Sequence, residues 1–455
     1  MRNKFYTLVV ALVLYSIGTH AQEVKNDSVR YNQYGQKVTA IPVETEAQDG
    51  FIKWTSTDGS YKMWMDNRVQ FDGNFFMDSD VYNPIGNGFN IRRARFAVKA
   101  EFWNNWYGEI DLDFEGSGTE IKDAYVKYMP DSRRWNIKAG HFKEGYGMET
   151  TTTSRYLKFM ERSYANAFDP SRHLGFQSNY FGNKFVLIGG VHFNTVGDAE
   201  EVAFSKDHNK YDNTDEGYSL TGRAVWAPIN DQDKLLHLGV SGTYRTPKTH
   251  YEIIDAVRIS ERSHSAINRK KYLDTDDIKD VDNQSGYTFE LAGKYKGLMF
   301  QGEYKQHAVN RKGDLIDANF DAFYVQAAYL LLGGNQNYNT REGEFTRVTT
   351  GSDKGDLELA LRYDYINLND FDAGITGGSA EGYTVGLNYY FNPNVKFVVN
   401  YVYNNHDRFA NYKGKLYVGH DAAGNLTKDP FSVVEADGEA GDDFGMLGFR
   451  FEVNF

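Results

Sequence analysis

The chain has 455 residues, no cysteine and a formal net charge of −12. The absence of cysteine excludes a disulfide framework and thiolate chemistry, and the acidic balance disfavours nucleic acid as a partner. Tyrosine (33), phenylalanine (31) and glycine (44) are abundant, whereas proline (8) is scarce. This composition favours β-strands, because proline removes hydrogen bonds from a sheet.

The first 21 residues have the parts of a secretory signal peptide. Residues 1–4 carry two basic side chains, residues 5–17 form an apolar run, and small residues precede a cleavage site at Ala21. The apolar run is shorter than the roughly 20 residues that a membrane-spanning helix needs. We therefore expect residues 1–21 to be a signal peptide. Residues 22–60 are polar and lack a helical period, so we expect an N-terminal periplasmic extension with a short strand at 50–55.

From about residue 61 to residue 455, apolar and polar side chains alternate in short runs. In one run Leu359 and Leu361 alternate with Glu358 and Arg362. Such a strand has one face for lipid and one for water, so the average hydropathy of a membrane barrel stays low. Similar runs lie at 69–75, 106–115, 287–295, 383–391 and 395–403, and counting all of them gives about sixteen strands.

This pattern predicts an all-β fold, a transmembrane antiparallel β-barrel with inward-folding loops at residues 61–455. The alternatives are a soluble sandwich and a propeller. A sandwich does not need so many strands, and the repeat of roughly 40 to 50 residues that is typical of a propeller is missing.

The connections between the runs differ in length as they do in outer-membrane barrels, which have short periplasmic turns and long outer loops. Tight turns are expected at 181–184, 296–297 and 392–394. Long loops are expected at 143–172, 197–216, 248–285 and 405–441. The connection at 333–354 is long but lies on the short-turn side, so it must either hang in the periplasm or fold back into the lumen.

The last run, residues 445–455, alternates strictly. Phe449, Phe451 and Phe455 lie on one face, and Arg450 and Glu452 lie on the other. We expect this strand to close the barrel on the first strand. Phe455 should then lie at the inner membrane interface, as part of the signal that the barrel-insertion machinery reads.

Several segments resemble one porin family. The segments at 66–72, 91–96, 138–143, 159–163, 357–363 and 385–394 are similar to those of the phosphate-selective porin O and P family. The resemblance implies a sixteen-stranded homotrimeric porin of the bacterial outer membrane, in contact with lipid and lipopolysaccharide and working without a cofactor. It also implies a lumen narrowed by inward-folded segments, where arginine and lysine draw in small anions such as phosphate. The loop at 143–172 is then the best candidate for the constriction, followed by 248–285 and 333–354.

The stretch at 91–96 supplies positive charge for such a lumen. On strict alternation Arg93, Arg95 and Lys99 face the lumen and Arg92 faces lipid. An arginine on the lipid face costs roughly 2 to 4 kcal/mol at mid-depth, so Arg92 lies either at the rim or on a β-bulge, and the paired arginines of the family favour the bulge. The candidate pore-lining and anion-binding residues are Arg68, Arg92, Arg93, Arg95, Lys138 and Lys143.

Cross-strand ion pairing is the competing interpretation of these arginines. The next strand places Glu109, Asp111, Asp113 and Glu115 on the lumen face, where they meet Lys99, Arg95 and Arg93. Such pairs stabilise a barrel wall, but they cancel the field that selects anions. The sequence therefore leaves open whether the pore is a general one or prefers phosphate.

Other functions have less support. An outer-membrane enzyme of the lipase or protease type needs a serine and a histidine placed together, and the sequence places no catalytic residues in this way. A non-conducting structural or adhesive barrel is the third possibility. The acidic run from residue 274 to residue 283 lacks the glycine and the spaced acids of a calcium loop, so no metal site is expected.

Overall fold

The computed structural model of the protein describes residues 30–38, 41–48, 50–77, 82–116, 118–196, 217–247, 255–436 and 438–455. The expected signal peptide at 1–21 and the expected loop at 197–216 lie outside these residues. No helix among the described residues is long and apolar enough to cross a membrane.

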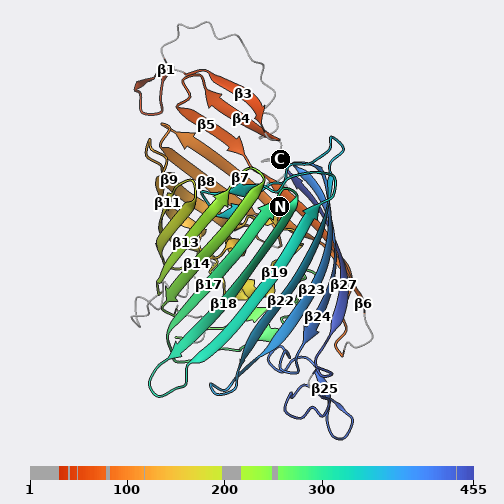
Figure 1. Cartoon of the computed structure of the whole chain (residues 1–455). Helices are drawn as coiled ribbons and strands as arrows, with labels where there is room; N and C mark the ends of the chain where they lie inside the picture. Colours follow the sequence, from red (N-terminus) through yellow and green to blue (C-terminus); the bar gives the residue numbers. More distant parts are fainter. Residues whose placement is uncertain are drawn as a thin grey trace, which may run out of the picture.

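Within the described chain, sixteen antiparallel strands form a closed barrel (Figure 1). They are β6 (Arg68–Met77), β7 (Gly88–Phe102), β8 (Trp106–Asp113), β9 (Glu120–Tyr128), β10 (Trp135–Lys143), β11 (Arg172–Phe181), β12 (Phe185–His192), β13 (Ser219–Asn230), β14 (Lys234–Arg245), β17 (Val281–Tyr295), β18 (Leu298–Arg311), β19 (Ala318–Leu330), β22 (Asp356–Asp370), β23 (Ile375–Asn392), β24 (Val395–His406) and β27 (Phe444–Asn454). Each strand pairs with the next, and β27 pairs with β6 from Gly445 to Asn454. The predicted fold class and the predicted closure by the terminal strand are confirmed.

Three further strands continue the wall beyond this circle. They are β3 (Val43–Gln48), β4 (Phe51–Ser56) and β5 (Tyr61–Met65), and β5 pairs with the end of β7. β4 is the strand that the sequence predicts at 50–55. A separate pair, β1 (Arg30–Tyr31) and β2 (Lys37–Val38), precedes them. All five strands lie at the short-turn end of the barrel, which is drawn at the top in Figure 1.

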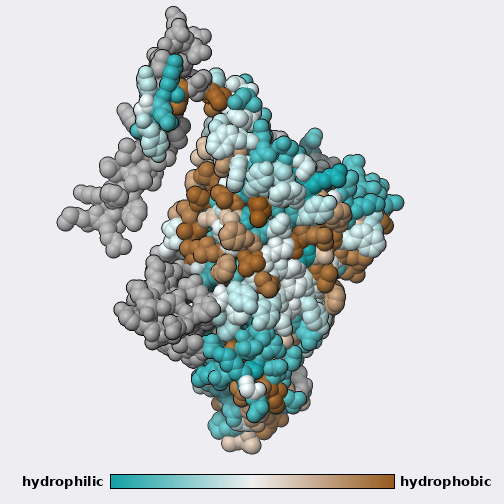
Figure 2. Space-filling view, turned by 90° about the vertical axis from the view of Figure 1, so that its left-hand side faces the viewer, coloured by the Kyte–Doolittle hydropathy of each residue, from teal (hydrophilic) through white to brown (hydrophobic). Residues whose placement is uncertain are grey.

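Side chains alternate between lipid and lumen along the barrel strands, as the sequence predicts. On β22, Leu359 and Leu361 are exposed on the outer face, whereas Glu358 and Ala360 are buried inside. Figure 2 shows hydrophobic side chains gathered around the middle of the molecule, with hydrophilic ones towards the ends. The apolar outer surface matches the hydrocarbon layer of a membrane.

The short and long connections also follow the prediction. Tight turns join β7 to β8, β11 to β12, β17 to β18 and β23 to β24, and long loops occupy 144–171, 246–280 and 407–443. The last of these carries β25 (Gly419–His420) and β26 (Leu426–Thr427) at the long-loop end. The unusual connection at 331–355 folds back into the lumen, because Arg223 of β13 donates hydrogen bonds of 2.8 Å to the carbonyls of Glu342 and Gly343.

The connection at 144–171, residues 255–280 of the next inserted loop and the connection at 331–355 all enter the lumen. Residues 144–171, called the inward loop below, contain α2 (Met148–Thr151), η1 (Ser154–Tyr156) and η2 (Tyr164–Phe168). Residues 246–280 contain β15 (Ser260–Glu261) and β16 (Leu273–Asp274), and residues 331–355 contain β20 (Tyr338–Asn339) and β21 (Glu344–Phe345). The sequence names these same three segments as candidate constrictions.

Apolar packing fills one side of the lumen. Met148, Phe159 and Phe345 pack against lumen-facing alanines that include Ala292 and Ala360. These small side chains leave room for the inserted segments. A second cluster joins the inward loop and the loop at 246–280 to β17–β23. The open, polar part of the lumen therefore lies beside β6–β12.

Candidate functional site

The inward loop is held across the lumen by polar contacts with several strands. Lys158 pairs with Glu358 of β22 at 2.9 Å, and the Met160 amide donates a hydrogen bond to Asn400 of β24 at 2.8 Å. Glu161 accepts hydrogen bonds from Arg450 of β27 at 3.0 Å. These three strands belong to one run of neighbours in the barrel. The Gly147 amide also donates a hydrogen bond to Ser241 of β14 at 3.0 Å, on another part of the wall. The loop therefore crosses the pore and narrows it.

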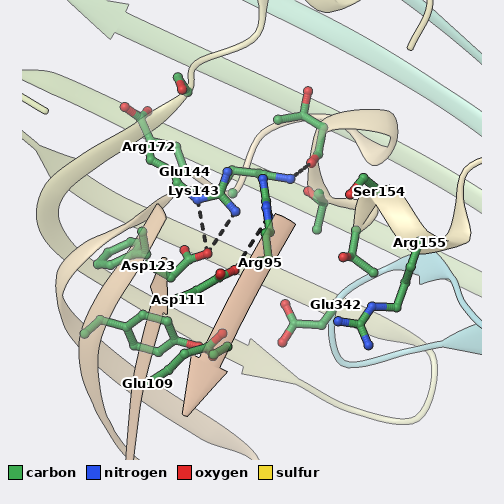
Figure 3. Close-up of a pocket in the computed structure, with 18 of the residues that line it drawn as sticks. Arg95, Glu109, Asp111, Asp123, Lys143, Glu144, Ser154, Arg155, Arg172 and Glu342 are labelled. Atoms are coloured by element: carbon green, nitrogen blue, oxygen red, sulfur yellow. Dashed lines mark hydrogen bonds and ion pairs between the residues drawn. The ribbon is translucent and has the colours of Figure 1, made fainter. Parts of the chain in front are cut away.

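A cavity of about 430 Å³ lies between the inward loop and the wall formed by β6–β12 (Figure 3). Nine basic and seven acidic side chains line it. Of the six residues that the sequence nominates, the structure brings five together here, namely Arg68, Arg93, Arg95, Lys138 and Lys143. The cavity also receives Lys99, Arg155, Arg162 and Arg172, which were not nominated.

Four of the nine basic side chains pair with carboxylates. Arg95 lies 3.1 Å from Asp113 and 3.6 Å from Asp111, and Lys99 lies 3.4 Å from Glu109. These pairs match the cross-strand alternative for Arg95 and Lys99. For Arg93 that alternative is wrong, because Arg93 donates to Gln70 and Glu115 pairs with Arg92. Two further pairs, Arg172 with Asp123 and Arg155 with Asp66, involve residues outside that prediction. The charges of these cations are largely cancelled.

The other five basic side chains make no ion pair with any described residue. They are Arg68, Arg93, Lys138, Lys143 and Arg162. Neutral groups hold them instead. Arg93 donates to Gln70 at 2.7 Å, Arg68 to the Ser154 hydroxyl at 2.5 Å, and Arg162 to the Thr152 carbonyl at 2.7 Å. Lys143 donates to the Thr150 carbonyl, and Lys138 lies 4.2 Å from the centre of the Phe142 ring. Their positive charge is therefore offset less than that of the four paired cations.

Arg92 lies on a β-bulge, as the family's paired arginines suggest. Gln70 is opposite Arg93 and Phe71 is opposite Ile91, so Arg92 has no partner in the ladder. Its guanidinium turns inward and donates to Glu161 at 2.7 and 3.0 Å. Arg92 lines a second cavity of about 150 Å³ rather than the main one.

The cavities form a series along the lumen. The outer cavity of about 150 Å³ shares Arg93, Arg162 and Asn166 with the main cavity. A smaller cavity beside the turn at 392–394 shares Arg155 with it. Arg93 and Arg162 thus line both the outer and the main cavity, and Arg155 lines both the main cavity and the one beside the turn.

Three carboxylates of the cavity lie close enough to hold a cation. Oxygens of Glu109, Asp111 and Asp123 lie within 4.8 Å of one another, and Figure 3 shows them along one side of the cavity. Each already faces a cation, namely Lys99, Arg95 and Arg172 respectively. The group is therefore an alternating ion-pair network, and it gives no reason to expect a metal.

Glu344 in the connection at 331–355 interacts electrostatically with Lys143, Arg162 and Glu342 of the cavity. Burial, followed by the charge of Glu342, raises its pKa from the ordinary 4.5 to about 8, although Lys143, Arg223 and Arg162 favour the ionised form. We expect anion preference to fall as the pH rises through about 8, because the carboxylate then becomes negative beside Lys143. Reversal potentials at about pH 6 and about pH 10 measure this change, and Glu344→Gln should make it smaller.

The raised pKa of Glu344 also makes the free energy of unfolding depend on pH. The folded-state pKa of Glu344 exceeds the unfolded value, so its contribution to stability is full below about 4.5 and is lost as the pH rises through about 8. If the anion preference falls with rising pH as much in Glu344→Gln as in the wild type, a group other than Glu344 titrates.

Comparison with known proteins now identifies the family. A family model described as phosphate-selective porin O and P matches residues 65–423. The chain belongs to this porin family. The porin is 23% identical to Porin O of Pseudomonas aeruginosa over 407 residues, which cover 80% of this chain and 88% of Porin O. It is 28% identical over 364 residues to an uncharacterised protein of Caulobacter vibrioides, covering 77% of this chain and 70% of that protein.

A solved structure supports the fold. The anion-selective porin from Comamonas acidovorans aligns with a TM-score of 0.51 and 11% identity, over 87% of this chain and all of that chain. Membership of the porin family makes the protein an outer-membrane channel for small hydrophilic solutes, which confirms the predicted location and transport class. The main cavity beside the inward loop is the part of its lumen where the charged side chains gather.

Proposed function

We propose that this porin conducts small hydrophilic anions, phosphate among them, in preference to cations. The observation that carries the proposal is the imbalance of unpaired charge in the main cavity. Five basic side chains there lack a carboxylate partner among the described residues, whereas Glu342 is the one lining acid without a cation at ion-pair distance. In a narrow lumen Coulomb attraction is weakly screened, so this local excess outweighs distant charges.

The net charge of −12 does not contradict this proposal. Part of it lies in the loops at the long-loop end. Residues 274–282 contain five aspartates and one lysine, and none of them lines the main cavity. Charges beyond about 10 Å are screened at an ionic strength of about 0.1 M. The selectivity of the pore follows the charges at its narrowest part.

Planar-bilayer measurements on the purified porin test the proposal. In a salt gradient we expect open-channel current with a reversal potential of anionic sign, and an anion-to-cation permeability ratio of about 10, because the unpaired cations contribute more than 1.4 kcal/mol. Added phosphate should reduce the chloride current by occupying the same cations. A channel with no preference, or one that prefers cations, would contradict the proposal.

The assembly of the porin follows the family. We propose a homotrimer in contact with outer-membrane lipid and lipopolysaccharide, with a signal peptide at residues 1–21. Residues 22–60 are proposed to be periplasmic, which is supported by the position of β3 and β4 at the short-turn end. Phe455 exchanges backbone hydrogen bonds with Asn67 at 2.7 and 3.1 Å. This contact at the end of the terminal strand supports the proposal that the barrel-insertion machinery recognises that strand as the barrel closes.

A channel is also a better proposal than a hydrolase or a non-conducting barrel. Ser263 lies 2.6 Å from His406, the arrangement a serine hydrolase requires. Both side chains are at most 3% exposed, and His406 is stacked on Tyr272. A substrate cannot reach this pair, so we assign it to fixing the loop at 246–280 inside the barrel. The charged series of cavities supports conduction over a purely structural role.

A further inference from the structure

The main cavity is larger than an inorganic phosphate ion requires. Its volume of about 430 Å³ lies in the range of roughly 300 to 1,000 Å³ that is typical of pockets for organic molecules. A phosphate ion has only five heavy atoms. A phosphate on the unpaired cations therefore leaves space beside it, and the chemistry of the remaining wall decides what else can enter.

The remaining wall offers hydrogen-bond acceptors. Asp111 is 8% exposed, and its Oδ1 atom is buried without a hydrogen-bond donor. Glu342 lines the cavity without a cation partner among the described residues, and Figure 3 shows its carboxylate across the cavity from Asp111. A buried acceptor without a donor is unfavourable. A solute that carries donors would relieve this cost.

The same acids disfavour a longer polyanion. A second phosphoryl group beside the first would approach Asp111, Glu109 or Glu342, and like charges in a narrow site repel. Neutral hydroxyl groups meet no such repulsion and can donate to these carboxylates. Hydrogen bonds to charged acceptors are also stronger than neutral ones. The wall therefore discriminates between two kinds of phosphate compound of similar size.

We propose that the main cavity binds phosphate monoesters of polyhydroxylated molecules, such as sugar phosphates, more tightly than inorganic phosphate. The phosphoryl group lies against the unpaired cations Arg68, Arg93 and Arg162, and hydroxyl groups donate to the Asp111 and Glu342 carboxylates. The inference rests on the proposed anion preference and names the class of anion.

Block of the chloride current through the full-length porin in planar bilayers tests the inference. The probes are inorganic phosphate, glucose 6-phosphate, pyrophosphate and glucose. The first two are compared at about pH 8.5, where both are predominantly dianions. We expect glucose 6-phosphate to block at about tenfold lower concentration than inorganic phosphate. Pyrophosphate should block less well than glucose 6-phosphate, and glucose should not block.

Variants of Glu342 and Asp111 test whether their carboxylates cause the tighter block by glucose 6-phosphate. Glu342→Gln and Asp111→Asn should each reduce the ratio of the two half-blocking concentrations from about tenfold to about threefold or less. The ratio is the readout, because loss of a negative charge tightens both phosphates together. Glu46→Gln, on the exposed strand β3 outside the barrel circle, is the matched control and should leave the ratio unchanged.

Three results would overturn the inference. The first is equal block by inorganic phosphate and glucose 6-phosphate, and the second is tightest block by pyrophosphate. The third is a ratio of half-blocking concentrations that stays at the wild-type value in both Glu342→Gln and Asp111→Asn. Each of them leaves the anion preference measured by reversal potential intact. A wild-type channel without anion preference would instead reject the proposed function itself.

Discussion

Replacing Arg93 and Arg162 together with glutamine is expected to lower the anion-to-cation permeability ratio about tenfold. Both guanidinium groups lie at the junction of the outer and main cavities, and neither has a carboxylate partner among the described residues. A unit charge about 4 Å from a permeating ion contributes roughly 1 to 4 kcal/mol, and 1.4 kcal/mol is tenfold. The measurement is the reversal potential of single channels in a salt gradient.

The control for this result is an arginine outside the cavities. Arg269 is exposed and lies 3.5 Å from Glu115, so Arg269→Gln removes one positive charge without changing the junction. We expect its reversal potential to match that of the wild type. An unchanged ratio in the Arg93 and Arg162 double variant would show that selectivity lies elsewhere.

Arg450→Ala is expected to destabilise the barrel by about 3 to 5 kcal/mol. Arg450 is 1% exposed and donates two hydrogen bonds of 2.7 Å to Asp72 of β6. It also donates to Glu161 and to the Met160 carbonyl in the inward loop. Its loss leaves Asp72 buried without this cation. Urea unfolding followed by tryptophan fluorescence measures the change, and single-channel conductance should rise because the inward loop loses an anchor.

Two further variants separate the ion pair between Arg450 and Asp72 from the packing of the Arg450 side chain. Arg450→Lys keeps the charge but cannot form the two-pronged contact, so an intermediate loss is expected. In a double-mutant cycle with Asp72→Ala, the two losses should not add, because each removes the same interaction. Additive losses would mean that the contact with Asp72 contributes little.

The barrel could be predicted from the sequence because its period is simple. Alternation of lipid-facing and lumen-facing side chains on β22 and β27 follows directly from strand geometry. The bulge at Arg92 could also be inferred, since an arginine on the lipid face is costly. The tight turns and long loops likewise follow from the spacing of the strands.

The composition of the cavity could be predicted only in part. Lys99 and Arg95 meet Glu109 and Asp113 by strand register, which the sequence shows. Arg155 and Arg162 lie in the inward loop, and no periodic rule says where such a loop directs its side chains. Asn166 and Glu342 were missed for the same reason. Contacts between segments about 200 residues apart, such as Lys158 with Glu358, leave no local signal.

The anchoring of the inward loop has a consequence for the order of assembly. Arg68 and Arg450, which hold Ser154 and Glu161 of that loop, come from β6 and β27, the first and last strands of the circle. The inward loop lies early in the chain, but its contact with Arg450 cannot form until β27, the last strand, has paired with its neighbours. A barrel that has not yet closed would therefore conduct without selectivity. The pairing of β27 with β6 both closes the wall and completes the anchoring of the inward loop.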